Sequence, residues 1–242
     1  MSTKVGRLLR PGPGRDDEGF PDEPNLRRIR DYSRDGVYRS LAESLDRSGL
    51  DRFDLVLIHD PDEHWSEAVG AAYPALAQLK SEGAVSAIGV GMNQSAMLAR
   101  FVREADLDVV LVAGRYSLLD RDAATELLPL CQRRRVTVLA GGVFNSGILA
   151  APETNPHFNY APATELQQRQ VARLQQACRA HGVPLAAAAI QFPLRHPAVR
   201  TVVVGARSAD EVRADVALAA VPIPAPLWED LDRITWERPH AR

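Results

Sequence analysis

The stretch DLVLIHDPDEHW, which starts at residue 54, joins an apolar run to a cluster of titratable side chains that includes His59, Asp60, Asp62 and His64. Imidazole and carboxylate groups are metal ligands, and they also donate and accept protons in catalysis. Successive side chains of a strand point to opposite faces and Pro61 turns the chain, so the four groups do not easily converge. We therefore expect no metal site, and a single imidazole, His59, at the end of a strand.

Two further segments carry groups that suit an anionic ligand. In VVVGARSADEV, Ser208 and Glu211 have the spacing of a helix cap, and the free N–H groups of that helix start, beside Gly205 and Arg207, suit an anion. In AGGVFNSG, glycines allow a flat ligand to approach the backbone, and polar side chains supply hydrogen bonds. Both segments also have a purely structural interpretation, as a helix cap and as relief of crowding.

The elements that position these groups follow an alternating order of strand and helix. Near-continuous apolar runs, typical of strands buried on both faces of a parallel sheet, occupy 53–59, 85–92, 107–114, 136–143 and 201–206. Helical patterns occupy 36–48, 66–82, 94–105, 121–134, 164–181, 208–219 and 225–235, and 184–195 reads as an additional, Ala-rich buried helix. The stretches 10–33 and 150–163 and the tail from 236 are expected to be irregular.

This order predicts an α/β fold. No G-x-G-x-x-G follows the first strand, which argues against a doubly wound dinucleotide domain. Polar or unusual residues instead end each strand, and that distribution is typical of a (β/α)8 barrel. Only five clear strands are visible, and neither an internal repeat nor a linker is found, so we expect residues 1–242 to form one incomplete barrel domain.

Composition excludes several classes of protein. Hydrophobic residues make up 45% and charged residues 25% of the 242-residue chain, and the net charge is −2, which argues against nucleic acid and against anionic membranes as partners. No apolar run is long enough to span a bilayer, and the N-terminus has no secretory pattern. Two isolated cysteines without redox or metal spacing predict a cytoplasmic protein.

The segments FDLVLIHDPD, AIGVGMNQ, GRYSLLDR, GGVFNSGIL and TVVVGARS together resemble the aldo-keto reductases, in particular their subgroup of aldose, L-fucose and pyridoxal dehydrogenases. The resemblance runs in order from residue 2 to about residue 231. It implies a (β/α)8 TIM barrel that transfers hydride between NAD(P) and a carbonyl or alcohol, such as an aldose or aldehyde, without a metal.

The resemblance also assigns catalytic residues. Lys4, in Ser2-Thr3-Lys4 at the end of the third strand, and His59, at the end of the fourth, match two of the family's four catalytic positions. The motif that carries the other two, an Asp and a Tyr, is not found, and the first two to three strands of the barrel are absent from this sequence. A start codon placed too late explains this better than a degraded chain, and we expect the 242-residue chain alone to have little or no activity.

Cofactor contacts are implied in the same way. Asn93 matches the position that binds the carboxamide, and Tyr116 or its neighbour Arg115 borders the nicotinamide ring. The remaining positions match the pyrophosphate loop and the adenosine segment: Phe144, Asn145, Ser146, Gly147, Gly205, Arg207, Ser208, Glu211 and Asp215. Asp210 and Glu211 would repel a 2′-phosphate, so NAD is expected in preference to NADP, with Arg207 as the counter-argument.

Two alternatives stay open beside the oxidoreductase. One is a non-catalytic barrel remnant that binds a dinucleotide or a protein, and the other, less favoured, is a metal-assisted hydrolase built on His59 and its acidic neighbours. The oxidoreductase implies a small carbonyl or sugar substrate that the sequence does not specify. An open barrel would expose strand edges and apolar surface, so self-association is also expected.

Overall fold

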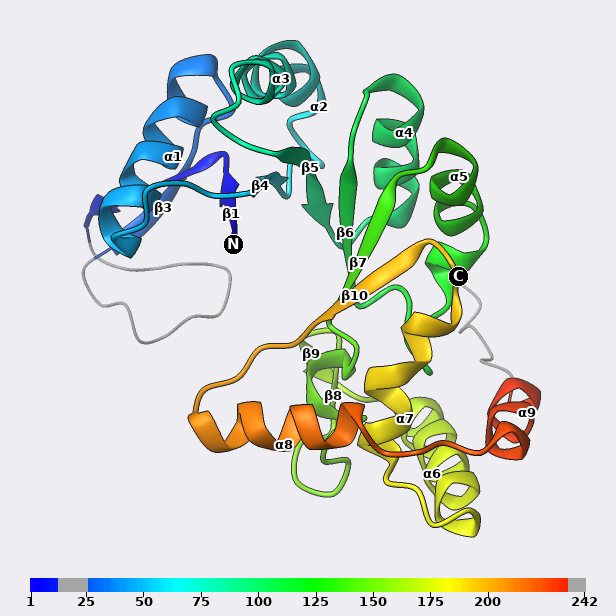
Figure 1. The fold of residues 1–242 in the computed structure, drawn as a ribbon. Helices are drawn as coiled ribbons and strands as arrows, with labels where there is room; N and C mark the ends of the chain where they lie inside the picture. Colours follow the sequence, from blue (N-terminus) through cyan, green and yellow to red (C-terminus); the bar gives the residue numbers. More distant parts are fainter. Residues whose placement is uncertain (13–25, 235–242) are drawn as a thin grey trace. The chain divides into compact units, whose positions relative to one another are not determined.

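The computed structural model describes residues 1–12 and 26–234, and the chain divides into two compact units, Met1–Leu111 and Val112–Arg242 (Figure 1). Each unit contains parallel strands followed by helices, as the alternating pattern predicts. The organisation as one domain stays a prediction.

The first unit contains a parallel sheet with the strand order β1 (Ser2–Val5), β4 (Leu55–His59) and β5 (Ala87–Met92). The interior of β4 is buried on both faces, which is why its sequence reads as an unbroken apolar run. The predicted strands 53–59 and 85–92 are confirmed, with slightly shorter bounds. Because β4 ends at His59, opposite Gly91 of β5, the imidazole lies at the carboxyl end of the sheet.

Helices follow these strands at the predicted places (Figure 1). They are α1 (Arg34–Ser48), α2 (Trp65–Glu67), α3 (Tyr73–Ser81) and α4 (Ser95–Glu104). The side chain of Ser33 caps α1 by accepting the N–H of Gly36 at 3.0 Å, and Gly49 ends the helix in the left-handed conformation.

Between α2 and α3 the predicted continuous helix 66–82 contains a π-helical turn, Ala68–Ala72. The N–H of Tyr73 bonds to the carbonyl of Ala68, five residues back. Pro74 has no N–H with which to continue an α-helical ladder, and the altered hydrogen-bond spacing lies immediately before it.

The stretch 10–33 is not irregular where it is described. Strands β2 (Arg7–Pro11) and β3 (Leu26–Arg30) form an antiparallel pair, with Arg7 opposite Arg30, while residues 13–25 lie outside the described part of the chain. The sequence pattern missed β3 because its arginine-rich residues are mostly exposed and do not form an apolar run.

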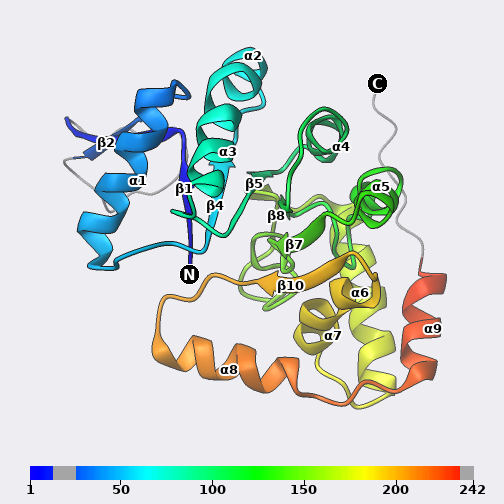
Figure 2. The ribbon, with the colours of Figure 1, turned by 45° about the horizontal axis from the view of Figure 1, so that its top comes forward.

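The second unit contains the parallel pair β7 (Thr137–Gly141) and β10 (Val199–Val203), whereas β6 (Val109–Ala113) runs across the boundary between the units. Its helices are α5 (Leu127–Arg134), α6 (Glu165–Ala180), α7 (Leu185–Gln191), α8 (Ala209–Ala219) and α9 (Ala225–Arg233). Figure 2 shows α7 beside α6 and α8, and α9 along α6. The core of α7 is buried, as its alanine-rich sequence predicts.

Three predicted bounds differ in this unit. β10 starts at Val199 and ends at Val203, with an irregular register after Val199, rather than covering 201–206. The helical patterns 121–134 and 184–195 each include a 3-10 turn, Asp122–Ala124 and Phe192–Arg195, where Pro193 stands in the first turn of the latter.

Two very short strands also lie in the second unit, inside a stretch that was expected to be irregular. β8 (His157–Phe158) and β9 (Ala161–Pro162) pair across the two-residue loop Asn159–Tyr160. Both loop residues have positive φ, 47° and 70°, as such a tight hairpin requires.

In the part of the chain that the structure describes, no helix is both long enough and apolar enough to cross a lipid bilayer.

Candidate functional site

At the carboxyl end of β4, one carboxylate lies between two basic side chains. Arg7 donates from Nη2 to Oδ2 of Asp60 at 2.6 Å, and Nε2 of His59 lies 3.3 Å from the same oxygen. Arg7 is only 9% exposed, whereas His59 and Asp60 are 28% and 29% exposed. We call these residues, with Lys4 and Tyr32, the His59 cluster.

The backbone under this cluster is tightly held. Tyr32 is buried and donates its hydroxyl to the carbonyl oxygens of His59 and Asp60 at 2.7 and 2.8 Å. The N–H of Asp60 bonds to the carbonyl of Gly91 at 3.0 Å, although Asp60 has a positive φ of 43°. Gly6 is required beneath the ring, because a Cβ there would overlap Cε1 of Tyr32.

The electrostatic surroundings set the protonation of the cluster. Burial, followed by the positive charges of Lys4, Arg7 and Arg28, lowers the pKa of His59 to about 3, so its imidazole is neutral at physiological pH. Desolvation also lowers the pKa of Lys4, which Asp60 opposes and Arg7 reinforces. Burial raises the pKa of Tyr32 to about 12, and its hydroxyl proton is already committed to backbone carbonyls.

The other titratable groups of the turn point elsewhere. Asp62 accepts a hydrogen bond from the side chain of Gln94 at 2.9 Å, and Nδ1 of His64 lies 3.5 Å from Glu67. Within residues 1–12 and 26–234, no group of three or more His, Cys, Asp or Glu side chains is placed to hold a metal ion. Asn93, the predicted carboxamide ligand, lies half-buried directly after β5.

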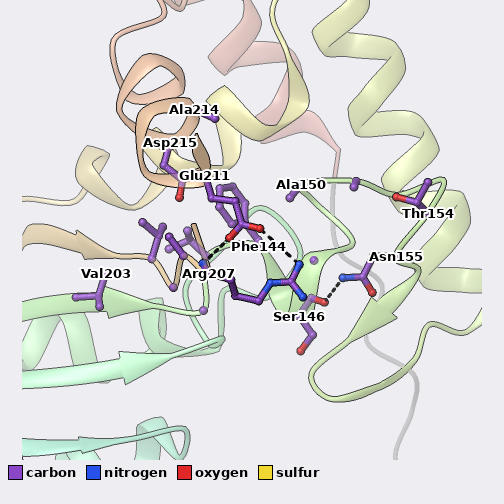
Figure 3. Close-up of a pocket in the computed structure, with 17 residues that line it drawn as sticks. Phe144, Ser146, Ala150, Thr154, Asn155, Val203, Arg207, Glu211, Ala214 and Asp215 are labelled. Atoms are coloured by element: carbon purple, nitrogen blue, oxygen red, sulfur yellow. Dashed lines mark hydrogen bonds and ion pairs between the residues drawn. The ribbon is translucent and has the colours of Figure 1, made fainter. Parts of the chain in front are cut away.

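The second unit contains an open cavity of about 890 Å³. Its walls come from the loop after β7 and from the segment that joins β10 to α8 (Figure 3). Seven of the predicted cofactor residues line it: Phe144, Ser146, Gly147, Gly205, Arg207, Glu211 and Asp215. At Gly205 a Cβ would meet no atom within 4 Å, so the backbone there faces open space. We call this space the glycine-lined cavity.

Helix α8 begins at this cavity with the cap that the sequence predicts. Oγ of Ser208 accepts the N–H of Glu211 at 3.1 Å. The carboxylate of Glu211 departs from the reciprocal pattern, because it accepts the N–H of Arg207 at 2.6 Å instead of that of Ser208. Glu211 also lies 3.5 Å from the guanidinium of Arg207, and the side chain of Arg207 is 93% exposed. Figure 3 shows the two side chains next to each other.

Asn145 is not among the residues that line the cavity. It is 1% exposed, and its side chain accepts from Ser117 Oγ at 2.5 Å and donates to Gly114 O at 3.2 Å and Asn159 Oδ1 at 3.1 Å. These bonds use its oxygen and both N–H groups. Asn145 thus ties the cavity loop to the β8–β9 hairpin.

The remaining predicted residue of this unit, Tyr116, is also largely buried. It is 8% exposed, and its ring lies 5.1 Å from that of Phe192 and 6.2 Å, edge-on, from that of His196. Burial raises the pKa of its hydroxyl. The neighbouring Arg115 is paired with Asp120 at 3.2 Å, so both side chains have partners in their own unit.

Several residues of the two sites escaped sequence reasoning. Tyr32 belongs to the stretch 10–33 that was expected to be irregular, and Arg7 lies shortly before that stretch. No local pattern brings either residue to β4. Asn155 and Thr154 line the glycine-lined cavity from a similarly irregular stretch. The side chain of Asn155 donates to the carbonyl of Ser146 at 3.0 Å (Figure 3). No sequence signal marked these four residues as parts of a site.

The chain is similar to proteins of one known family. The model of the Aldo/keto reductase family matches residues 2–235 of the chain. D-threo-aldose 1-dehydrogenase of a Pseudomonas species is 45% identical over 96% of this chain and 73% of its own length. Pyridoxal 4-dehydrogenase of Microbacterium luteolum is 40% identical over 96% of this chain and 74% of its own.

A solved structure shows the same arrangement of elements. The holo form of an aldo-keto reductase from Bacillus halodurans matches with a TM-score of 0.72 and 25% identity. The match covers 97% of this chain and 72% of that one.

Proposed function

The chain belongs to the aldo/keto reductase family and has the α/β fold of the family's (β/α)8 barrel, of which it spans about three quarters. We propose that it oxidises an aldose or a related sugar with NAD. Membership makes the chain an oxidoreductase of a family that uses NAD(P)H, as the sequence predicts. The substrate is proposed from D-threo-aldose 1-dehydrogenase, at 45% identity, with pyridoxal-like carbonyl compounds as the neighbouring class.

One observation carries the cofactor half of this proposal, namely that the two segments assigned to the dinucleotide line one cavity. The glycine-lined cavity fits a pyrophosphate, because Gly205 leaves its backbone open and α8 begins at the cavity, where the positive end of the helix dipole favours an anion. Arg207 adds an exposed cation. Once bound there, the nicotinamide would supply a hydride acceptor.

The chain's own groups would then act on the substrate oxygen. We assign Lys4 and His59 to this task, His59 as a neutral hydrogen-bond donor and Lys4 as a cation near developing negative charge. Asn93 and Tyr116 remain proposed contacts of the nicotinamide, and Asn145, Ser208 and Asp215 proposed contacts or supports of the rest of the dinucleotide.

NAD is preferred to NADP because the nearby cations are already paired. Arg207 lies 3.5 Å from Glu211, and Arg213 lies 2.6 Å from Asp210, so little net positive charge is left for a 2′-phosphate. Titration by cofactor fluorescence should show NAD(H) bound more tightly than NADP(H). Glu211→Arg should move the preference toward NADP by removing a repulsive charge and adding a cation.

Glu229→Arg is the matched control, since Glu229 lies on α9, is 68% exposed and does not line the glycine-lined cavity. It makes the same change of charge and should leave the ratio of the two dissociation constants unchanged. Tighter binding of NADP by the unaltered chain would mean that Arg207 attracts the 2′-phosphate more strongly than Asp210 and Glu211 repel it, and the predicted preference for NAD would be wrong.

Turnover tests the activity itself. The 242-residue chain alone is expected to show little or no turnover, so whichever form of the protein is active is assayed with NAD and a series of aldoses, aldehydes and pyridoxal. Aldoses should be its best substrates. Turnover of aldehydes alone would contradict the proposed substrate class. Location in the cytoplasm is proposed from the two buried, unbridged cysteines, Cys131 and Cys178.

We also propose that the chain associates with itself. Among the described residues, β1 pairs only with β4 and β10 only with β7, so each is an edge strand of its own unit. Val212 and Val216, one turn apart on α8, are 51% and 65% exposed. Light scattering should therefore show a mass above that of one chain, and Val216→Lys should lower it. A monodisperse monomer at all concentrations would contradict this.

A further inference from the structure

The carboxylate of Asp60 is the shared partner of the His59 cluster. The same oxygen, Oδ2, accepts from Arg7 at 2.6 Å and lies 3.3 Å from Nε2 of His59. The other acids of the turn do not take this place, because Asp62 accepts from Gln94 and Glu63 lies 3.9 Å from Arg30. Asp60 is therefore the acid that faces the imidazole.

The backbone of the turn is strained at Asp60, and this conformation places the carboxylate beside His59. A φ of 43° is uncommon for a residue other than glycine, and such conformations persist where the surroundings hold them. Here the Tyr32 hydroxyl bonds to the carbonyl oxygens of His59 and Asp60, which lie before and after the Asp60 Cα, and the carbonyl of Gly91 accepts the Asp60 N–H. Strands β4 and β5 and Tyr32, two residues before α1, thus fix one orientation of the Asp60 side chain.

The contact restricts which nitrogen of His59 carries the proton. A neutral imidazole has one N–H, and an ionised carboxylate only accepts hydrogen bonds. Burial lowers the pKa of His59 most, and the cations Lys4, Arg7 and Arg28 of β1, β2 and β3 lower it further, so the ring is neutral. Next to Asp60 Oδ2, the ring is therefore more stable with its proton on Nε2 than with a bare lone pair there.

We propose that Asp60 is a positioning residue, which holds His59 as the Nε2–H tautomer with that proton at the mouth of the site. On the proposed function, a substrate oxygen then receives this N–H when it displaces the long contact to Asp60. Arg7, held by the same carboxylate, prevents Asp60 from turning away. Only the use of this proton, as a donor to a substrate oxygen, rests on the proposed function. The tautomer of His59 is a property of the chain without substrate.

The test reads the tautomer directly. In chain labelled with ¹⁵N-histidine, two-bond proton–nitrogen correlation spectra at neutral pH distinguish Nε2–H from Nδ1–H rings, and His59→Asn assigns the signal. We expect His59 of the unaltered chain to be almost entirely Nε2–H. Asp60→Asn should shift it toward Nδ1–H, because the amide N–H₂ can donate to Nε2. Asparagine tolerates positive φ, so the turn keeps its conformation.

Asp62→Asn is the matched control, since it makes the same change two residues away on a side chain that binds Gln94. It should leave the His59 signals unchanged. An Nδ1–H ring in the unaltered chain overturns the proposal even if Asp60→Asn fails to fold, and so does a His59 tautomer that Asp60→Asn leaves unchanged. Failure of NAD binding, or turnover of aldehydes but not aldoses by the active form of the protein, would overturn the proposed function and leave this result as it stands.

Discussion

Replacing His59 by alanine is expected to lower kcat/KM for sugar oxidation by about 10²–10³-fold, the usual effect of losing a preorganised hydrogen-bond donor at a reacting oxygen. Cofactor affinity should not change, because the residues assigned to the dinucleotide remain. The measurement is steady-state kinetics with a separate cofactor titration, on whichever form of the protein turns over, the 242-residue chain or a longer one. Since burial and three cations lower the pKa of His59 to about 3, kcat/KM should show no inflection from this residue near pH 6.5.

Two variants separate a donor at the site from a merely polar turn. His59→Gln keeps an N–H group and should retain part of the lost activity. His64→Ala removes an imidazole from the same turn, where it contacts Glu67 and the ring of Tyr32, and should have a much smaller effect. An unchanged kcat/KM in His59→Ala would mean that His59 is only a polar residue of the turn and not a hydrogen-bond donor to the substrate.

Gly89→Ala is expected to destabilise the first unit by more than about 4 kcal/mol, a loss comparable with the whole stability of many domains. A Cβ at Gly89 would lie 2.8 Å from the carbonyl carbon of Val109 and far closer to its oxygen, as well as 2.8 Å from Cδ2 of Leu57. The obstacle on one side is backbone, so no side-chain rotation relieves it, and β5 has to move away from Val109. Urea unfolding monitored by circular dichroism measures the loss in free energy of unfolding. If the variant loses all of its stability, it should be misfolded or insoluble.

Gly91→Ala is the matched control in the same strand and on the same face. Its Cβ would lie 3.4 Å from Cβ of Leu111 and 3.6 Å from Cδ1 of Leu57, which are ordinary contacts between side chains. The change should cost less than about 1.5 kcal/mol. Equal unfolding midpoints for the two variants would show that the approach of Val109 to Gly89 is not a constraint of the fold.

The strands and most helices follow from the sequence because they depend on burial patterns of a few neighbouring residues. The apolar run of Val56, Leu57 and Ile58, in a chain where strands and helices alternate, predicts a buried strand. Ser33 and Ser208 cap helices by hydrogen bonds to the N–H three residues later. Where local chemistry is ambiguous, the prediction failed. The exposed arginines of β3 carry no apolar period, and the π-helical turn before Pro74 has no signature that a helical pattern distinguishes.

For the candidate site, residue types at strand ends were enough to nominate His59 and the two segments of the glycine-lined cavity, since parallel strands bring their carboxyl ends to one edge. The partners of these residues depend on folding. Tyr32 bonds to the backbone of His59, and Arg7 bonds to Asp60, although each pair is far apart in the sequence. The side chain of Asn145 bonds to Ser117 instead of lining the cavity. None of these contacts could be predicted from the sequence. Hydrogen bonds and desolvation act through space, so a group's protonation and orientation emerge only when segments far apart in the chain are packed together.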